Sequence, residues 1–227
     1  MTKAHPSTAI LYFSRSLELE VRNKTLLTKK SQNFSCIRAL HEHSFDIIKK
    51  SGLPVFHFEE SQQKGDSFGE RISNAFKDLF DEGYSQIISV GNDCPDLAIG
   101  DINDAVANLS LNDIVLGPDQ HGGAFLIGLS KDSFDYEGVK NLNWQSDQLI
   151  SSFEAFASLQ KKNFTFIDAK ADLNNNGDVA EYSSISEQLA LILKKIFFEE
   201  HFLKLLFVSL YFIQASGRNF HRGPPTE

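Results

Sequence analysis

Cysteine is the residue whose scarcity excludes most about this chain. The 227 residues include two cysteines, Cys36 and Cys94, which lie far apart and without the spacing of metal ligands. A disulfide framework or a zinc site would need more cysteines at closer spacing, so neither is indicated. We therefore expect a protein of the reducing cytoplasm.

Positive charge and long apolar runs are also lacking. The 22 lysines and arginines stand against 30 acidic residues, and the net charge of −8 disfavours nucleic acid and acidic membranes as partners. The longest apolar segment, residues 202–213, includes Lys204 and falls short of the roughly 20 residues that span a bilayer. The N-terminus has no secretion signal pattern. We expect a soluble protein with no nucleic-acid partner and no membrane span, in which local cations or a metal would neutralise any phosphorylated ligand.

What is present is an alternation of short β-rich runs with amphipathic helical patterns. Two of the helical faces run from Ile37 to Ile48 and from Phe68 to Phe80. Asp101 is predicted to cap a third helix, and Ser146 or Asp147 a fourth. Such alternation is typical of an α/β sheet that is covered on both sides. The predicted strands are Ala9 to Phe13, Pro54 to Phe58, Gln86 to Val90, Asp113 to Leu116, Ala124 to Leu129 and Phe164 to Ile167.

The C-terminal part differs from the rest in its pattern. We expect one domain over residues 1–184, a helical extension over 185–215 and a mobile tail over 216–227. The extension is apolar on too many sides for a simple surface helix. Either it passes through the core or a partner subunit covers it, and we favour a homodimer contact.

The segment "VGNDCPDL" breaks a buried-strand pattern, Gln86 to Val90, with a glycine and two carboxylates. Gly91 permits an unusual backbone angle, and Pro95 prevents a simple helical continuation. In open α/β sheets ligands bind outside the carboxyl ends of the strands, where a carboxylate can hold Mg²⁺ or Mn²⁺. Asp93 is the better candidate ligand, and Asp96 is expected to cap the following turn. Alternatively, both are ordinary loop or cap residues.

A second cluster lies in "LGPDQHGGAFLIGL", residues 116–129. Asp119 and His121 precede the pair Gly122 and Gly123, and paired glycines let the backbone approach a ligand closely. The polar side chains would then point at that ligand. The alternative is a tight turn between strands with a solvated histidine.

A third cluster, "QQKGDSFGERI", precedes a predicted helix. Gly65 and Gly69 bracket Asp66, and free backbone N–H groups at the helix start could bind a phosphate, with Arg71 close by. The segment has neither a Walker A pattern nor a dinucleotide fingerprint. A capped helix start explains it equally.

Cations and further carboxylates follow two other strands. Arg15, Arg22 and Lys24 lie on an expected loop after the first strand, where they could neutralise a nucleotide phosphate or simply be solvated. Asp168 and Asp172 follow the last strand. They could supply a second metal ligand or belong to an ordinary turn rich in asparagine and glycine.

The order of these clusters resembles a largely uncharacterised bacterial transferase family of the GT-A nucleotide-diphospho-sugar transferase superfamily, known as radical-SAM/selenodomain-associated transferases or as a domain of unknown function. The resemblance covers roughly residues 8–175 and is most specific over 65–71 and 91–97. It depends on the charged loop after the first strand and on "KGDSFGER", "VGNDCPDL", "LGPDQHGGAFLIGL", "NWQS" and "IDAKADL".

The resemblance implies a three-layer α/β/α sandwich with a mainly parallel sheet and a nucleotide bound across its rim. It places Asp93 in the metal-binding role of a D-x-D motif, with Mg²⁺ or Mn²⁺ as the cofactor. Lys24 and Arg71 would lie near the phosphates, and Asp119 or His121 near the acceptor. The ligand implied is a nucleotide or nucleotide sugar.

Two departures from the family pattern leave two functions open. The family's "KTRL" stretch is here Lys24-Thr25-Leu26-Leu27, and His121 stands where an aspartate usually precedes the paired glycines. The chain could be a metal-dependent transferase, glycosyl or nucleotidyl, acting on an unknown acceptor. It could instead be a catalytically reduced homologue that binds a nucleotide or a partner protein.

Overall fold

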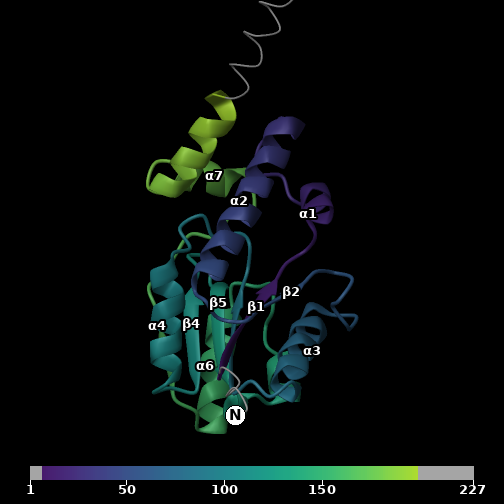
Figure 1. Ribbon diagram of the computed structural model, residues 1–227, viewed down its shortest axis with the longest axis vertical. Helices are drawn as coiled ribbons and strands as arrows, with labels where there is room; N and C mark the ends of the chain where they lie inside the picture. Colours follow the sequence, from purple (N-terminus) through teal and green to yellow (C-terminus); the bar gives the residue numbers. More distant parts are fainter. Residues whose placement is uncertain (1–6, 199–227) are drawn as a thin grey trace, which may run out of the picture.

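A computed structural model of the chain describes residues 7–198. Its centre is a six-stranded sheet with the order β2-β1-β3-β5-β4-β6 (Figure 1). Every neighbouring pair is parallel except the two pairs that β5 makes with β3 and β4. The strands are β1 (Thr8–Phe13), β2 (Val55–Phe58), β3 (Gln86–Val90), β4 (Ile114–Pro118), β5 (Ala124–Ser130) and β6 (Phe164–Phe166).

The direction of each strand follows from its connection. Residues 119–123 join β4 directly to β5, and a short link of this kind makes two neighbouring strands antiparallel. Helices join the successive strands from β1 to β4, and long connections of this kind allow parallel pairing. The sheet is therefore mixed but mostly parallel, as expected from the sequence.

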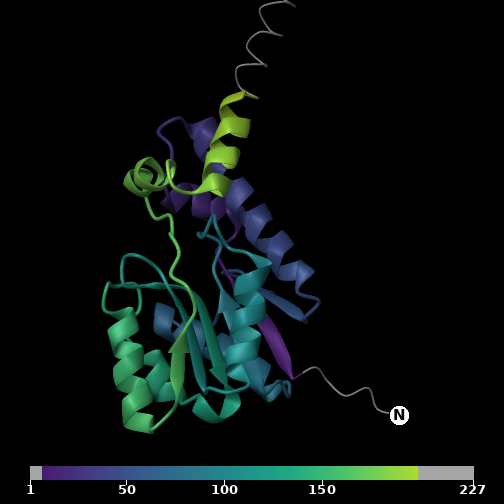
Figure 2. The ribbon, with the colours of Figure 1, turned by 90° about the vertical axis from the view of Figure 1, so that its left-hand side faces the viewer.

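Helices cover both faces of the sheet, which confirms the predicted three-layer arrangement (Figure 2). On one face, alternate strand residues such as Leu11 and Ile87 pack against α3 (Phe68–Asp81) and α6 (Leu149–Gln160). On the other face, residues such as Ile10 and Ile88 pack against α4 (Ile99–Leu109) and the end of α2 (Lys30–Lys50). A short helix, α5 (Tyr136–Lys140), and the 3₁₀ turn η1 (Lys131–Ser133) complete the first face.

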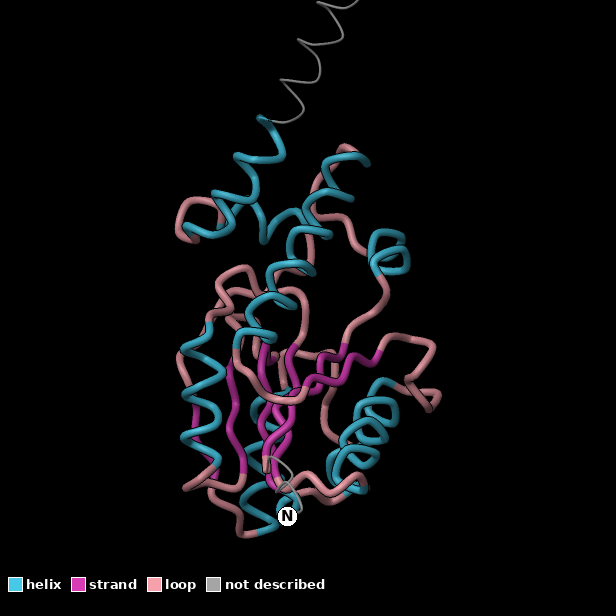
Figure 3. Tube along the Cα trace, viewed as in Figure 1, coloured by secondary structure: helices cyan, strands magenta, loops and turns pink. Residues whose placement is uncertain are grey.

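A separate helical lobe lies beyond the carboxyl end of β1, on the side of the sheet that we call the sheet edge (Figures 1 and 2). It consists of α1 (Leu17–Asn23), the first half of α2, α7 (Asn176–Tyr182) and helical residues 187–198. Its own apolar core includes Leu26, Ile37, Leu40, Leu173, Tyr182, Leu189 and Ile192. The lobe and the sheet edge face each other across loops (Figure 3).

Three local predictions were wrong in detail. The segment after β1 forms helix α1 instead of a loop, because Ser16 accepts a hydrogen bond from Leu19 N and begins a turn. Asp101 lies inside α4, and its carboxylate accepts from Ala98 N at 2.7 Å. Helix α6 begins after Gln148, beyond both predicted caps.

The described residues cover only part of the predicted C-terminal extension. Within them, residues 187–198 are helical and bury Leu189, Ile192 and Ile196 in the lobe core. The apolar run 202–213, its predicted homodimer contact and the predicted tail 216–227 lie outside the described residues. Among residues 7–198, none of the helices is both long and apolar enough to cross a bilayer.

One buried side chain holds the segment between α1 and α2. Asn33 Oδ1 accepts from Leu26 N at 2.7 Å and Leu27 N at 3.1 Å, while its Nδ2 donates to Lys24 O at 2.9 Å. Asn33 is 6% exposed, so water cannot readily replace it. These bonds fix the backbone of Lys24 at the base of the lobe.

Replacing Asn33 by alanine should therefore destabilise the protein. Three backbone groups would lose their buried partner, and we expect a loss of roughly 2 kcal/mol in the free energy of unfolding, measured by urea denaturation. Asn23→Ala is the control, because the exposed Asn23 side chain donates to the Leu19 carbonyl of its own helix. Equal effects of the two substitutions would contradict this role for Asn33.

Candidate functional site

A cavity of about 610 Å³ lies where the sheet edge meets the helical lobe. It opens at the end of β1, the end of β3 and the β4–β5 turn, and its floor reaches between α3 and α6. Gly65, Asp66 and Gly122 do not line it. The predicted site residues that do line it are Arg15, Lys24, Arg71, Asp93, Asp119, His121 and Gly123.

The centre of the polar side is an ion pair between Lys24 and Asp93. Lys24 Nζ lies 2.5 Å from Asp93 Oδ1 and 3.3 Å from Glu20 Oε1, and the Lys24 side chain is only 9% exposed. Burial alone would lower the pKa of Lys24, but the neighbouring charges of Asp93 and Glu20 outweigh burial and raise it. Lys24 is therefore a fixed cation at the cavity wall.

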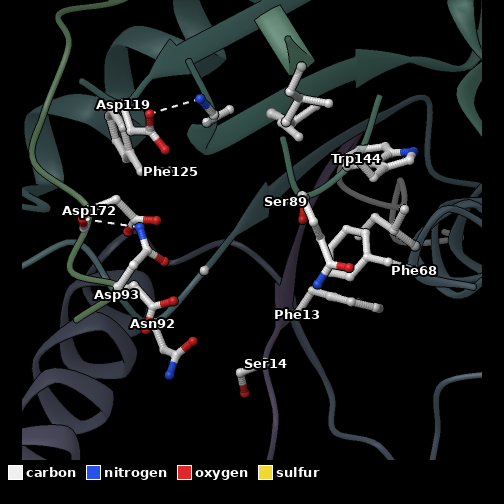
Figure 4. A pocket seen from close by; sticks show the side chains of 18 of the residues that line it. Phe13, Ser14, Phe68, Ser89, Asn92, Asp93, Asp119, Phe125, Trp144 and Asp172 are labelled. Atoms are coloured by element: carbon white, nitrogen blue, oxygen red, sulfur yellow. Dashed lines mark hydrogen bonds between the residues drawn. The ribbon is translucent and has the colours of Figure 1, made fainter. Parts of the chain in front are cut away.

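Asp172 is a second carboxylate beside Asp93 (Figure 4). Burial first, and the negative charge of Asp93 second, raise the pKa of Asp172 well above its usual range, although Lys24 opposes this shift. The sequence pattern had offered Asp168 and Asp172 as possible metal ligands. Only Asp172 lines the cavity, whereas Asp168 is exposed on the preceding turn.

The "VGNDCPDL" loop is held from the lobe side. Leu173 N donates to Asp93 O at 2.9 Å, and Asn92 Nδ2 lies 2.6 Å from His41 Nε2 on α2. Asp96 does not cap the turn as predicted, because its Oδ1 accepts from Ser186 Oγ at 2.7 Å. Gly91 has an ordinary negative φ, so the expected unusual backbone angle is absent there.

The β4–β5 turn is organised by Asp119. Its Oδ1 accepts from His121 N at 2.7 Å and from Gly123 N at 2.8 Å, so this carboxylate closes its own turn. Gly122 has φ of 84°, and a Cβ there would lie 2.1 Å from Asp147 O. A Cβ on Gly123 would lie 2.3 Å from Asp119 Oδ2. Gly122 is thus required by its positive φ and its contact with Asp147, and Gly123 by its contact with Asp119.

His121 points toward the lobe. Its Nε2 lies 3.7 Å from Asp178 Oδ1, and its ring lies 6.3 Å from that of Tyr182 on α7. The side chain is 45% exposed, so it remains accessible from the cavity that it lines. His121 therefore lies at the solvent-accessible opening of the cavity.

The start of α3 uses its own N–H groups. Glu70 Oε2 accepts from Asp66 N at 2.8 Å and Ser67 N at 3.3 Å, and Ser67 Oγ accepts from Glu70 N. This capping box occupies three of the backbone donors at the helix start that the sequence pattern suggested for a phosphate. Arg71 extends from the same turn to the cavity, and its Nη1 donates to Asp66 O at 3.3 Å.

An aromatic wall faces the carboxylates across the cavity, and the sequence analysis did not identify it (Figure 4). Phe68 lies between Phe13 and Trp144, with ring centroids 5.6 Å and 5.3 Å away, respectively. Ser89 on β3 lies on the same side of the cavity. The one available signal was the "NWQS" segment, which holds the single tryptophan of the chain.

The fold is shared with solved structures of other proteins. The structure is similar to that of a protein from Desulfovibrio desulfuricans G20 that is described as a candidate nucleotide-diphospho-sugar transferase. The two are 18% identical, the match covers 84% of this chain and 98% of the other, and the TM-score is 0.70. The chain therefore has the α/β fold of nucleotide-diphospho-sugar transferase structures.

The chain also matches a family model over part of its length. Residues 39–144 match the model of DUF2064, described as an uncharacterized protein conserved in bacteria, and this span is somewhat less than half of the chain. None of the curated proteins matches the chain. The resemblance to an uncharacterised bacterial family with a transferase-like fold is confirmed at this level, and the narrower family name stays a prediction.

Two enzyme structures are more distant. One is 4-diphosphocytidyl-2C-methyl-D-erythritol synthase from Anaerococcus prevotii, 7% identical, with a TM-score of 0.48, covering 83% of this chain and 97% of the other. The second is a CMP:2-keto-3-deoxy-manno-octonic acid synthetase complexed with CTP, 8% identical, with a TM-score of 0.46, covering 83% and 100%. These TM-scores are too low to support a conclusion about this chain.

Replacing Asp172 by asparagine should stabilise the protein at neutral pH when no metal is present. The pKa of Asp172 is raised in the folded state above the value of about 3.9 in the unfolded chain. The stability that the protonated Asp172 carboxyl contributes to the folded state is therefore complete below about pH 4. It is lost as the pH rises through the pKa of Asp172 in the folded state. Asparagine does not titrate, so the variant should gain about 1 kcal/mol over the wild type at pH 7.

The measurement is urea unfolding of both proteins in EDTA between pH 4 and pH 8. The gain should shrink toward pH 4, because Asp172 is then protonated in the folded wild type and no longer costs stability. Titrations common to both proteins cancel in the difference. Asp168→Asn, on the exposed part of the same turn, should change stability by less than about 0.5 kcal/mol at every pH. A destabilised Asp172→Asn protein at pH 7 would contradict the assignment.

Proposed function

We propose that this protein is a metal-dependent transferase that binds a nucleotide sugar or a nucleoside triphosphate and transfers a glycosyl or nucleotidyl group to an acceptor. The observation that carries the proposal is the group of Lys24, Asp93 and Asp172 on the wall of the cavity at the sheet edge. In open α/β sheets this edge is where nucleotides bind. The fold shared with nucleotide-diphospho-sugar transferase structures supports the same conclusion.

The charge of the cavity supports a requirement for metal. Its lining has three cationic side chains, Arg15, Lys24 and Arg71, against five acidic ones. The acidic ones are Glu20, Asp93, Asp119, Asp147 and Asp172. A diphosphate would be repelled by this excess of negative charge unless a divalent cation bound with it.

The carboxylates suit Mg²⁺ or Mn²⁺, which prefer oxygen ligands. Asp93 and Asp172 would hold the ion. Burial first, and the negative charge of Asp93 second, raise the pKa of Asp172, and a bound cation would favour the ionised form of both carboxylates. Among the described residues no cluster of three or more acidic, histidine or cysteine side chains could hold a metal. Mg²⁺ commonly binds through one or two carboxylates, with phosphate and water completing its shell. When bound, the ion would neutralise charge on the departing diphosphate.

The chain's own side chains would orient the substrates. Lys24 would exchange its contact with Asp93 for a phosphate oxygen, since an ammonium makes charge-assisted hydrogen bonds with either group. Arg15 and Arg71 would bind other phosphate oxygens from the cavity rim. Asp119 would keep the β4–β5 turn closed, and His121 at the opening would accept a proton from the acceptor hydroxyl.

A second function is favoured by one observation. Lys24 already occupies Asp93 Oδ1, so the chain could keep this ion pair and bind a nucleotide or a partner protein without catalysis. Such a catalytically reduced homologue would bind its ligand equally well with and without metal. The two functions therefore differ in one measurable property.

That property is the metal dependence of ligand-induced stability. The full chain should be melted with nucleoside diphosphates, triphosphates and nucleotide sugars, each with Mg²⁺, Mn²⁺ or EDTA. A ligand at about 100 times its dissociation constant adds roughly 2.7 kcal/mol to the folded state, which raises the melting temperature by several degrees.

We expect Asp93→Asn to lose the metal-dependent part of this shift. Asp104→Asn is the control, because Asp104 lies on α4 outside the cavity lining and should respond as the wild type does. Stabilisation that persists in EDTA would favour the catalytically reduced homologue. Absence of any shift across the panel would refute nucleotide binding.

A further inference from the structure

The aromatic half of the cavity, here called the slot, is lined by packed rings. Phe13, Phe68 and Trp144 line it together with Ile72 and Ile127. Trp144 also packs edge-on against Phe153, with ring centroids 5.8 Å apart. Aromatic side chains placed in this way present faces and edges on which another flat ring can stack.

Close packing behind the slot fixes its walls. Trp144 Nε1 donates to Val139 O at 2.8 Å, so the indole N–H is already used by the protein. Gly69 brings α3 close to this turn, since a Cβ there would lie 2.1 Å from Lys140 O and 2.9 Å from Trp144 Cδ1. The indole ring is therefore held in place and offers a ligand only its apolar surface.

Ser89 supplies a hydroxyl on the same side of the cavity. It is 7% exposed, lines the cavity from β3 and makes no side-chain hydrogen bond to any residue between 7 and 198. Ser89 Oγ is not among the fully buried side-chain atoms that lack a partner, so it can be reached from the cavity and can bond a polar atom of a ligand in place of water. A hydroxyl can donate or accept, and so it fits either kind of partner atom.

We propose that the slot formed by Phe13, Phe68, Trp144 and Ser89 binds a flat ring with one polar substituent that hydrogen-bonds to Ser89 Oγ. This inference rests on the proposed function, because it assigns the half of the same cavity that lies opposite the carboxylates. The ring has two possible sources, the nucleobase of the donor or an aromatic ring of the acceptor. Both share the stacking and the single hydrogen bond, and they differ in whether a phosphate is attached.

Trp144 makes the proposal directly measurable, because it is the single tryptophan of the chain. The full-length protein is titrated with three kinds of probe, and the emission of Trp144 is followed. The probes are the four common nucleosides, phenol beside benzene, and inorganic triphosphate with Mg²⁺. We expect saturable quenching by a nucleoside or by phenol, since a ring stacked near the indole perturbs its emission.

Ser89→Ala tests the hydrogen bond. It should weaken binding of the ring with a polar substituent by roughly three- to ten-fold and should leave benzene binding within about two-fold. Ser73→Ala is the control, because Ser73 is a buried serine on α3 that does not line the cavity and whose hydroxyl has no partner among the described residues. Equal weakening in the two variants would overturn the role of Ser89.

The pattern of responses separates the two sources and the two proposals. Quenching by nucleosides that also compete with a stabilising nucleotide assigns the slot to the base. Quenching by phenol that persists with the nucleotide bound assigns it to the acceptor. If triphosphate with Mg²⁺ stabilises the protein while no ring probe quenches Trp144, the slot proposal is overturned and nucleotide binding stands. If ring probes quench Trp144 but no nucleotide stabilises the protein, the slot stands and the proposed function fails.

Discussion

The partly buried ion pair between Lys24 and Asp93 is the contact on which the rest of the site depends. Lys24 directly follows α1 in the helical lobe, whereas Asp93 follows β3 at the sheet edge. With Glu20 as the second carboxylate, the cation balances charges that burial would otherwise make costly. Removing one partner would leave an unpaired charge in the wall of the cavity. The pair therefore joins the helical lobe to the sheet edge, and the cavity lies between these two parts.

The helical lobe is part of the site because it supplies one wall of the cavity. Glu20 lies in α1, Lys24 directly follows α1, and Asp172 lies in the segment that precedes α7. The bonds from Ser186 to Asp96 and from Leu173 to Asp93 hold the β3 loop from the same side. An α/β sheet alone would present Asp93 to open solvent. The lobe turns this exposed edge into a partly enclosed site, in which charges on a ligand are screened less than in open water.

Most of the fold was predictable from local pattern. The expected strands match β1 to β6 within one or two residues at their ends, since buried runs such as "AILYF" and "IISV" are confined to one conformation by burial. Helix α1 was missed, because "LELEVRN" has too few apolar residues to show a helical face and depends on the Ser16 cap. Among the candidate residues, Asp93 and Lys24 were recognised singly. Their pairing, the position of Asp172 and the aromatic slot were not, because each joins segments far apart in the chain.

The sequence by itself determined which strands and helices form, their layered α/β arrangement and the chemical character of the loops at the sheet edge. These properties follow from local periodicity, capping and the position of glycine and proline. Only the tertiary structure decided which of those polar residues meet. Three features depend on distances set by packing: the capping box that occupies N–H groups before α3, the closure of the 119–123 turn by Asp119 and the position of Ser89 on the cavity. Packing brings together side chains from β1, α3, β3 and the lobe, and no local pattern encodes that meeting.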